Sequence, residues 1–413
     1  MQRFQRTKLA CYTAYFTMSS IFSLPPLLFV TFHTMYGISY TLLGTLVLVN
    51  FCTQLLVDLI FTVFSKHFNV HKVVKVMPLI TSLGLMLYAL VPMFALQAAY
   101  AGLVAGTVIF SVSAGLSEVL LSPVIAASPS ENPQRDMSML HSLYAFGVFT
   151  VVVVSTLALK VVGTHNWMYV TMFWALAPVA AAVLFMISPM PDMQMAHGSA
   201  KRATGKQTWG MALCVACIFF GSCAENGMSN WISGFMENAL HVDKAFGDIL
   251  GVAMFAILLG LMRIGYARYG KNIARTLLVG MVGAVVCYLV AGLSLNPVAA
   301  FAACVLTGVF TAMLWPGTLI LMEENMPGLG VAAYALMAAG GDLGASVAPQ
   351  LMGIVVDTVA ASDLAVRLGT MWQLTAEQVG MKAGMLVCAA FPLLGVAVVI
   401  MARKWFQKQN TKA

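Results

Sequence analysis

Apolar stretches long enough to cross a bilayer follow one another along almost the whole chain, with only short polar segments between them. A transmembrane helix needs about 20 predominantly apolar residues. Only 9% of the 413 residues are charged, whereas about a quarter are charged in an ordinary soluble protein. A soluble fold could not cover its surface with so few charges, and the apolar stretches are too long and too little alternating for a β-barrel. The sequence therefore predicts an all-α polytopic membrane protein.

The chain has room for about twelve transmembrane helices joined by short turns. We expect these helices over residues 9–32, 41–65, 73–94, 98–126, 138–162, 167–188, 209–237, 247–266, 276–294, 297–321, 331–357 and 380–402. The one substantial polar interruption, residues 189–208, contains two prolines and three basic residues. It predicts a cytoplasmic linker between an N-terminal bundle of six helices, 1–188, and a C-terminal bundle of six helices, 209–413.

The basic residues are distributed unevenly between the two sides that these helices define. Of the 22 Lys and Arg, 18 fall on the side that holds both termini. Because positively charged residues concentrate in cytoplasmic loops, we expect both termini to lie in the cytoplasm and the protein to lie in the cytoplasmic (plasma) membrane. The net charge of +7 then reflects topology, and nucleic-acid binding is not expected because no patch of basic and aromatic residues supports it.

Corresponding positions of the two halves carry similar features. Short basic loops follow the second and eighth helices, SKHFNVHKVVK (65–75) and ARYGKNIART (267–276). Pro25-Pro26 interrupts the first helix, and glycines and a serine interrupt its counterpart, the seventh. Interrupted helices at matching positions of two repeats favour a central substrate site, although glycine and proline are also common in membrane helices.

Four segments carry a resemblance to a known family: GLSEVLLSP (115–123), LHSLYAFG (140–147), LWPGTLILM (314–322) and GGDLGASVAPQLMGIVVD (340–357). With the six-plus-six pattern, they resemble the major facilitator superfamily over nearly the whole chain. The closer resemblance is to the bacterial sugar-permease branch that includes the fucose permeases. This resemblance implies twelve transmembrane helices arranged as two pseudo-symmetric six-helix bundles, which expose a sugar site to each side of the membrane in turn.

The loops that carry the superfamily's basic motif depart from its usual pattern. In the first loop Lys66 stands in place of the usual Asp, and only Lys72 of the motif remains. The second copy keeps Arg263 and Lys271. We therefore assign Lys66, Lys72, Arg263 and Lys271 to the gating loops. The first helix also lacks the acid that fucose-type permeases use, so any proton coupling must rest on other groups.

Ionisable groups inside a bilayer are costly and rarely face lipid, so they are the strongest candidates for proton coupling. Glu118 and His141 fall at similar depth on antiparallel helices and could form a proton relay or a structural pair, and the resemblance places Glu118 on the functional acid of the branch. Glu225 and Asp342 complete the candidates, the latter as a coupling group or as a structural acid among glycines. Asp58 is expected to be a helix-packing or gate residue.

Amides and aromatic rings within the helices are the candidates for substrate binding. Amides can donate to and accept from sugar hydroxyls, and aromatic rings can pack on the apolar face of a pyranose. The alternative is that these polar side chains join helices to one another. The substrate-binding candidates are Asn50, Gln54, Tyr144, Asn226, Asn230, Trp231 and Trp315.

No catalytic motif accompanies these groups. The chain has no Gly-rich phosphate loop and no ordered Ser-His-Asp set, and Cys214 and Cys217 fall within a membrane span. We therefore predict no enzyme activity, no cofactor and no metal. The predicted function is a monomeric secondary transporter that takes up a monosaccharide by proton symport, with the lipid bilayer as its surroundings. An uncoupled sugar facilitator and an exporter of amphipathic compounds remain open as alternatives.

Overall fold

The computed structural model describes residues 4–64, 68–130, 133–191, 205–326 and 331–410, and every regular element within these ranges is helical. The N-terminal half contains α1 (Gln5–Leu27), α2 (Phe29–Tyr36), α3 (Tyr40–Phe64), α4 (Val70–Phe94), η3 (Leu96–Ala98), α5 (Ala99–Ala127), α6 (Pro133–Val162), η4 (Thr164–Asn166) and α7 (Trp167–Ile187). The C-terminal half contains α8 (Gly205–Gly234), η5 (Phe235–Ala239), α9 (Lys244–Phe246), η6 (Gly247–Ala253), α10 (Met254–Tyr269), α11 (Ile273–Leu293), α12 (Pro297–Thr311), α13 (Leu314–Asn325), α14 (Val331–Ala360), α15 (Asp363–Trp372), α16 (Ala376–Cys388) and α17 (Ala390–Asn410).

Each predicted transmembrane segment coincides with a helix or with consecutive helices. Among the described residues, 10 helices are long and apolar enough to cross a membrane, and α1 and α2 together form an eleventh candidate. The remaining predicted segment falls on α6, where the apolar part, Phe146–Val162, is shorter. The all-helical fold class is confirmed. The short helix α15 was not predicted, because its apolar residues do not form a long run.

Prolines explain two of the breaks within the membrane segments. α1 and α2 meet at an angle of 48° just after Pro25 and Pro26, as the sequence predicts. α12 ends at Thr311 and α13 begins at Leu314, shortly before Pro316. Proline has no N–H to offer to the carbonyl four residues earlier, so the helix cannot complete its hydrogen bonds at this point.

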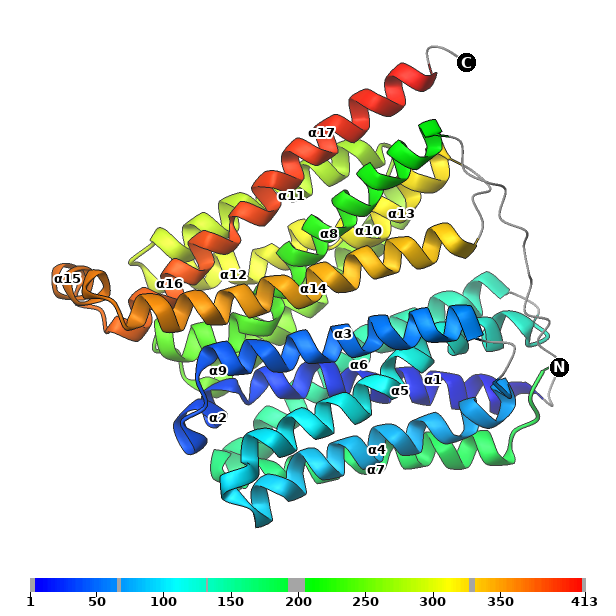
Figure 1. Cartoon of the computed structure of the whole chain (residues 1–413), viewed down its shortest axis with the longest axis horizontal. Helices are drawn as coiled ribbons and strands as arrows, with labels where there is room; N and C mark the ends of the chain where they lie inside the picture. Colours follow the sequence, from blue (N-terminus) through cyan, green and yellow to red (C-terminus); the bar gives the residue numbers. More distant parts are fainter. Residues whose placement is uncertain (1–3, 65–67, 131–132, 192–204, 327–330, 411–413) are drawn as a thin grey trace. The chain divides into compact units, whose positions relative to one another are not determined.

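The chain divides into two compact units (Figure 1). We call Met1–Ile38 with Val49–Ala196 the N-terminal unit, and Ser39–Leu48 with His197–Ala413 the C-terminal unit. The start of α3 thus belongs to the C-terminal unit, which the sequence did not predict. The predicted bundle boundaries, 1–188 and 209–413 with the linker 189–208, stay a prediction.

The helices of each unit have corresponding neighbours. In the N-terminal unit α1 packs on α5, α6 and α7, and α4 packs on α5 and α7. In the C-terminal unit α8 packs on α13, α14 and α17, and α11 packs on α12, α16 and α17. The internal packing of the two units therefore follows one scheme, as expected for a repeat.

Glycines allow the closest helix contacts in both units. A Cβ atom on Gly84 of α4 would lie 2.5 Å from the backbone nitrogen of Phe110 on α5. A Cβ on Gly280 of α11 would lie 2.5 Å from the backbone oxygen of Phe310 on α12. Small residues let membrane helices approach backbone to backbone, and these glycines occupy matching helix pairs of the two units.

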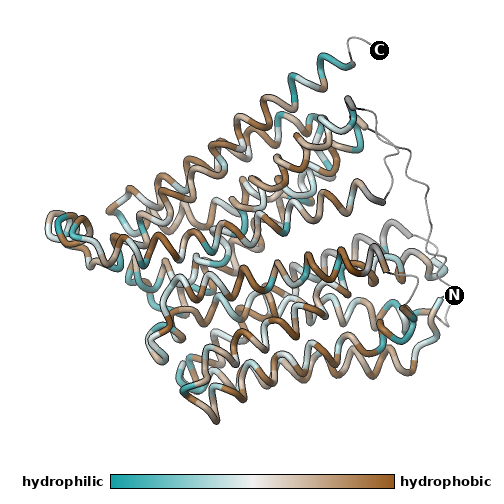
Figure 2. The backbone as a smooth tube through the Cα atoms, in the orientation of Figure 1, coloured by the Kyte–Doolittle hydropathy of each residue, from teal (hydrophilic) through white to brown (hydrophobic). Residues whose placement is uncertain are grey.

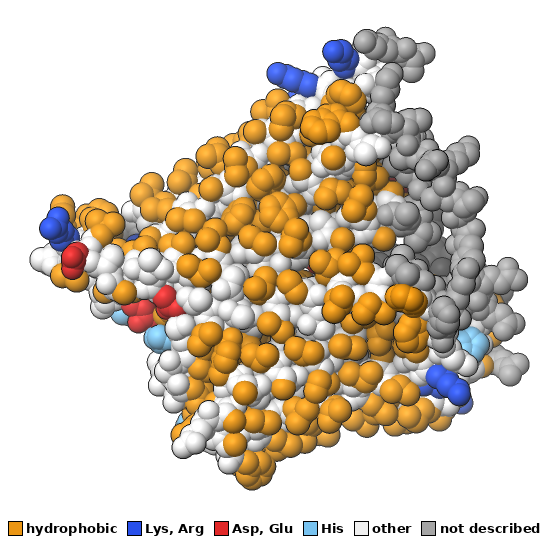
Figure 3. Space-filling view, in the orientation of Figure 1, with side chains coloured by type: hydrophobic (Ala, Val, Ile, Leu, Met, Phe, Trp, Pro, Cys, Tyr) orange, Lys and Arg blue, Asp and Glu red, His pale blue; other side chains and the backbone are white. Residues whose placement is uncertain are grey.

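The surface of the described residues is apolar along the helices. Hydrophobic residues run along most helices of both units, and hydrophilic residues gather toward many of their ends (Figure 2). In the space-filling view, hydrophobic side chains cover most of the visible face and Lys and Arg lie at its margins (Figure 3). Val161 and Phe94, for example, are 85% and 80% exposed. Large exposed apolar areas are unusual on soluble proteins and fit a surface that faces lipid.

Candidate functional site

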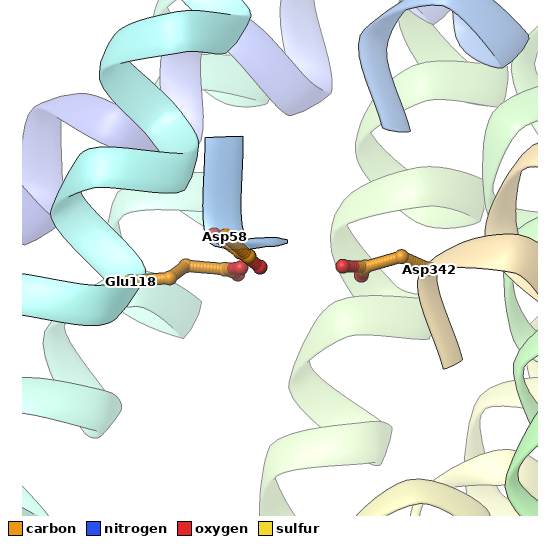
Figure 4. Close-up of side chains that lie close together, drawn as sticks. All are labelled: Asp58, Glu118 and Asp342. Atoms are coloured by element: carbon orange, nitrogen blue, oxygen red, sulfur yellow. The ribbon is translucent and has the colours of Figure 1, made fainter. Parts of the chain in front are cut away.

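Two carboxyl groups from neighbouring helices of the N-terminal unit point toward one another (Figure 4). Asp58 lies on α3 and Glu118 on α5, and a carboxylate oxygen of one lies within 4.8 Å of a carboxylate oxygen of the other. Glu118 is exposed, whereas Asp58 is half-buried and its Oδ1 has no hydrogen-bond partner among the described residues. Two negative charges this close repel one another, so the pair is chemically suited to share a proton. Figure 4 also labels Asp342, which belongs to the C-terminal unit and is described with it below.

Asp58 belongs to a polar face of α3 that also includes Asn50 and Gln54. The three residues are spaced by four, so they share one side of the helix. Gln54 Nε2 donates to Asn50 Oδ1 at 2.9 Å, and Ser111 Oγ of α5 donates to the same oxygen at 2.7 Å. Asn50 is 7% exposed and Gln54 is fully buried, although Gln54 Oε1 has no partner among the described residues. The structure therefore favours helix packing over direct substrate contact for Asn50.

An aromatic cluster lies in the same unit as the carboxyl pair. Tyr144 of α6 packs edge-on against Tyr15 and Phe22 of α1, at ring-centroid distances of 6.4 and 5.9 Å. Phe22 in turn lies 5.8 Å from Phe51 of α3. The rings of Tyr144, Phe22 and Phe51 are half-buried, so part of each apolar face is accessible.

Two of the predicted site residues lie outside the described part of the structure. Lys66 belongs to the undescribed segment 65–67, and the side chain of His141 is not described although its backbone is part of α6. The pairing of His141 with Glu118 and the gating role of Lys66 therefore stay predictions.

The C-terminal unit contains an ion pair that the sequence did not predict. Arg263 Nη2 of α10 lies 3.5 Å from Glu225 Oε1 of α8. Arg263 Nε donates at 2.9 Å to the carbonyl oxygen of Ala312, which is the oxygen left without a helical donor because Pro316 has no N–H. Arg263 lies within α10, which continues to Tyr269, and its assignment to the gating loops stays a prediction.

The amides that follow Glu225 bond to their own helix. Asn226 Nδ2 donates to the carbonyl and the hydroxyl of Ser222, each at 3.2 Å. Asn230 Nδ2 donates at 2.9 Å to the carbonyl of Asn226. Trp231 is 1% exposed and its Nε1 donates at 3.1 Å to the carbonyl of Pro349 on α14. The structure favours a packing role for Trp231 in the C-terminal unit, because its ring is buried and its N–H is bonded, and its role in substrate binding stays a prediction.

Trp315 and Asp342 lie at neighbouring positions of α13 and α14. The ring of Trp315 crosses Gly341 so closely that a Cβ there would lie 2.2 Å from it. Asp342 follows directly and is 4% exposed. On the same helix, a Cβ on Gly344 would lie 2.3 Å from the carbonyl oxygen of Phe219 on α8. The glycines around Asp342 thus allow the predicted close helix approach, while the stacking role of Trp315 and the coupling role of Asp342 stay predictions.

The two basic loops end in the same way. Asn69 caps α4 by accepting from the backbone N–H of Lys72, and Asn272 caps α11 by accepting from that of Arg275. Lys72 lies in the first turn of α4 and Lys271 lies between α10 and α11, both with exposed side chains. The matching caps support the repeat, and the gating roles of these lysines stay predictions.

The sequence analysis missed a charged cluster around the turn that joins α8 to α10. Lys244 Nζ lies 3.4 Å from a carboxylate oxygen of Glu237 and 3.4 Å from one of Asp248. Ser233 Oγ donates to Asp248 Oδ1 at 2.5 Å. Glu237 and Asp248 lie on the π-helical segments η5 and η6, and such segments occur frequently at functional sites. The available signal was the four charged residues among residues 237–248, around a predicted turn.

A second missed contact holds the first turn of α3 within the C-terminal unit. The carboxylate of Asp357 on α14 accepts from the backbone N–H groups of Tyr40 and Thr41, at 3.1 and 2.6 Å. The hydroxyl of Tyr40 donates to Glu377 and accepts at 2.7 Å from Asn238. A carboxylate at a helix N-terminus satisfies free N–H groups and favours the helix dipole. No local pattern could reveal this contact, because its partners lie more than 300 residues apart in the sequence.

Comparison with known proteins gives one family and several similar folds. A family model described as Major Facilitator Superfamily matches residues 9–349, and no curated protein sequence matches the chain significantly. A bacterial homologue of the human lysosomal transporter Spinster is similar in structure, with a TM-score of 0.77, 13% sequence identity and coverage of 99% of this chain and 98% of that one. A mutant of the nucleoside transporter NupG has a TM-score of 0.73 at 13% identity, with 96% and 99% covered. A mutant of the E. coli fucose:proton symporter FucP has a TM-score of 0.59 at 12% identity, with 97% and 99% covered. These TM-scores show a shared fold, and the fucose-permease branch stays a prediction.

Proposed function

Because the chain belongs to the major facilitator superfamily and is a multi-pass membrane transporter, not an enzyme, we propose that it moves a small polar solute together with a proton. The solute that we propose is a monosaccharide or a close derivative. Transport proceeds by alternating access, with uptake driven by the proton gradient.

The observation that carries the proton part is the Asp58–Glu118 pair. Its two carboxylate oxygens lie within 4.8 Å inside spanning helices, where ionisable groups are costly and mark ion or substrate pathways. When the pair holds one proton it carries one negative charge, and when it loses the proton it carries two. The exposed Glu118 exchanges the proton with water, and the half-buried Asp58 responds to the change in charge.

The aromatic cluster of Tyr15, Phe22, Phe51 and Tyr144 supports the solute part. Aromatic faces suit the apolar side of a pyranose, and the Tyr144 hydroxyl can donate to or accept from a sugar hydroxyl. The fold similarity to a fucose:proton symporter agrees with a sugar as the solute, but the proposal does not rest on it. We also propose that the protein acts as a monomer in the cytoplasmic membrane with both termini in the cytoplasm, on the strength of the distribution of Lys and Arg.

Uptake into liposomes that contain the purified full-length protein tests this proposal. A panel of labelled monosaccharides and sugar derivatives is offered with and without an inward proton gradient. We expect accumulation of one solute above equilibrium, abolished by an uncoupler. Equilibration without accumulation would instead indicate an uncoupled facilitator. If folded protein moves none of these solutes, the sugar proposal fails, and amphipathic compounds that pack on the aromatic cluster become the substrates to test.

A further inference from the structure

In the Arg263–Glu225 pair of the C-terminal unit, some hydrogen-bonding groups of both side chains are not used in the contact between them. Arg263 Nη2 and Glu225 Oε1 make one contact at 3.5 Å, longer than the 2.7–2.9 Å of a strong charge-assisted hydrogen bond and not the two-bond arrangement that Arg and carboxylate prefer. Glu225 Oε2 is buried and has no hydrogen-bond partner among the described residues. The ion pair is therefore weak, and each of the two groups can form stronger hydrogen bonds with a ligand.

The guanidinium is also held in position and partly accessible. Its Nε is bound to the carbonyl of Ala312 at 2.9 Å, which fixes the group at the break between α12 and α13 and leaves the Nη atoms to donate elsewhere. The Arg263 side chain is 40% exposed, whereas that of Glu225 is 20% exposed. A guanidinium within a spanning helix, fixed on one edge and open on the other, has the geometry that binds a planar anion in a bidentate way.

We propose that the transported solute carries a carboxylate and that Arg263 binds it. The substrate class is then a sugar acid rather than a neutral monosaccharide, an inference that rests on the proposed function and narrows it. Glu225 is the internal competitor that occupies the guanidinium when the site is empty. The carboxylate of the solute displaces Glu225 Oε1 from Nη2 and takes over the neutralisation of Arg263. Asn226, half-buried and next to Glu225, is placed to contact a hydroxyl of the same solute.

Binding to the purified full-length protein tests the inference, with D-glucuronate, D-gluconate and D-glucose as probes and the rise in melting temperature as the measurement. We expect the two acids to half-saturate the shift at concentrations about tenfold or more below that of glucose, because a charge-assisted pair adds that much affinity.

Three variants test the roles of the two side chains. Arg263→Gln should remove the higher affinity for the acids. Glu225→Gln should lower the half-saturating acid concentration several-fold, because the competing carboxylate is gone. Arg268→Gln, which removes an exposed arginine from the same helix, is the matched control and should change nothing.

The variants and the transport assay separate the possible failures. If Arg263→Gln does not fold, Arg263→Lys keeps the charge without the planar donor pair and should bind the acids more weakly, and Glu225→Gln still gives an independent result. Equal binding of glucose and glucuronate by the wild type, or unchanged acid binding by Arg263→Gln, would overturn the inference. If liposomes accumulate glucose with protons but not the acids, the proposed function stands and this inference fails. If folded protein binds and moves none of the three probes, both fail.

Discussion

Replacing Asp58 by Asn tests whether the two facing carboxyl groups act as one unit. Their oxygens lie within 4.8 Å, so two full negative charges repel by about 3.5 kcal/mol at an effective dielectric constant of about 20. The exposure of Glu118 lets solvent screen this repulsion, which lowers its contribution to stability. We expect Asp58→Asn and Glu118→Gln each to raise the free energy of unfolding at alkaline pH by about 1–3 kcal/mol, because each removes the repulsion. The double variant should gain no second increment.

The same variants should lose gradient-driven accumulation. A single acid next to an amide can no longer share a proton with a second acid, so we expect Asp58→Asn and Glu118→Gln each to abolish accumulation in liposomes. The double variant should be no worse than either single variant, because residues that act as a unit are not additive. Exchange of labelled for unlabelled solute across the membrane, which needs no net proton movement, should persist in all three.

Glu324→Gln provides the control for loss of one carboxylate, since Glu324 is exposed at the end of α13. Its accumulation and melting temperature should match those of the wild type. Full accumulation by Asp58→Asn together with its loss in Glu118→Gln would refute the reasoning, because Glu118 would then carry the proton alone. Additive melting shifts in the double variant would refute the electrostatic part.

Three further predictions concern stability, and each is checked by thermal unfolding of the purified variant. Gly84→Ala places a Cβ 2.5 Å from the backbone nitrogen of Phe110 and should cost about 1–3 kcal/mol through overpacking. Asp357→Ala removes the carboxylate that accepts two backbone N–H groups at the start of α3 and should cost about 0.5–2 kcal/mol, as loss of a helix cap does. Partial burial alone would raise the pKa of Asp136, but the ion pair with Lys8 at 2.5 Å and the hydrogen bonds to the carboxylate outweigh it and lower the pKa below the usual 3.8. Because the pKa of Asp136 is lower in the folded protein, its carboxylate stabilises the fold at pH values above the usual pKa. This stabilisation is lost as the pH falls through the lowered pKa. Asp136→Asn should therefore destabilise the protein at neutral pH and remove this pH dependence in acid.

The helices could be predicted from the sequence because the bilayer sets their length. Each transmembrane helix needs a long apolar run, and such a run can be recognised in the sequence without any knowledge of packing. The bend after Pro25 and Pro26 could also be predicted, because proline disrupts the hydrogen bonds of its own helix. α15 escaped prediction because a ten-residue helix at the surface leaves no comparable signature.

The site was less predictable because it depends on contacts between helices. Spacing alone places Asn50, Gln54 and Asp58 on one face of α3, but not which helix that face meets. Asp58 was therefore predicted to be a helix-packing or gate residue, and only the structure shows that Glu118 faces it. Trp231 shows the same dependence, because its polar neighbours predicted substrate contact, whereas the sequence could not show that its N–H is bonded to the carbonyl of Pro349.

The two units share the features that build the fold and differ in the charges that they hold. Asn69 and Asn272 cap matching helices, and Gly84 and Gly280 allow matching contacts. The charges do not match, because the N-terminal unit holds two facing acids whereas the C-terminal unit holds an arginine with an acid. The first arrangement suits one added positive charge and the second suits one added negative charge.

A proton on the carboxyl pair and a carboxylate on Arg263 would together add no net charge. Transport of one proton with one sugar acid should therefore be electroneutral. We expect uptake into liposomes to follow the pH gradient and to stay unchanged when the membrane potential is set by a potassium gradient and valinomycin. A neutral sugar moved with one proton would carry positive charge, so its uptake would rise with an inside-negative potential. A potential-dependent uptake of the acid would contradict the division of charge between the two units, because at least one further charge would have to move with it.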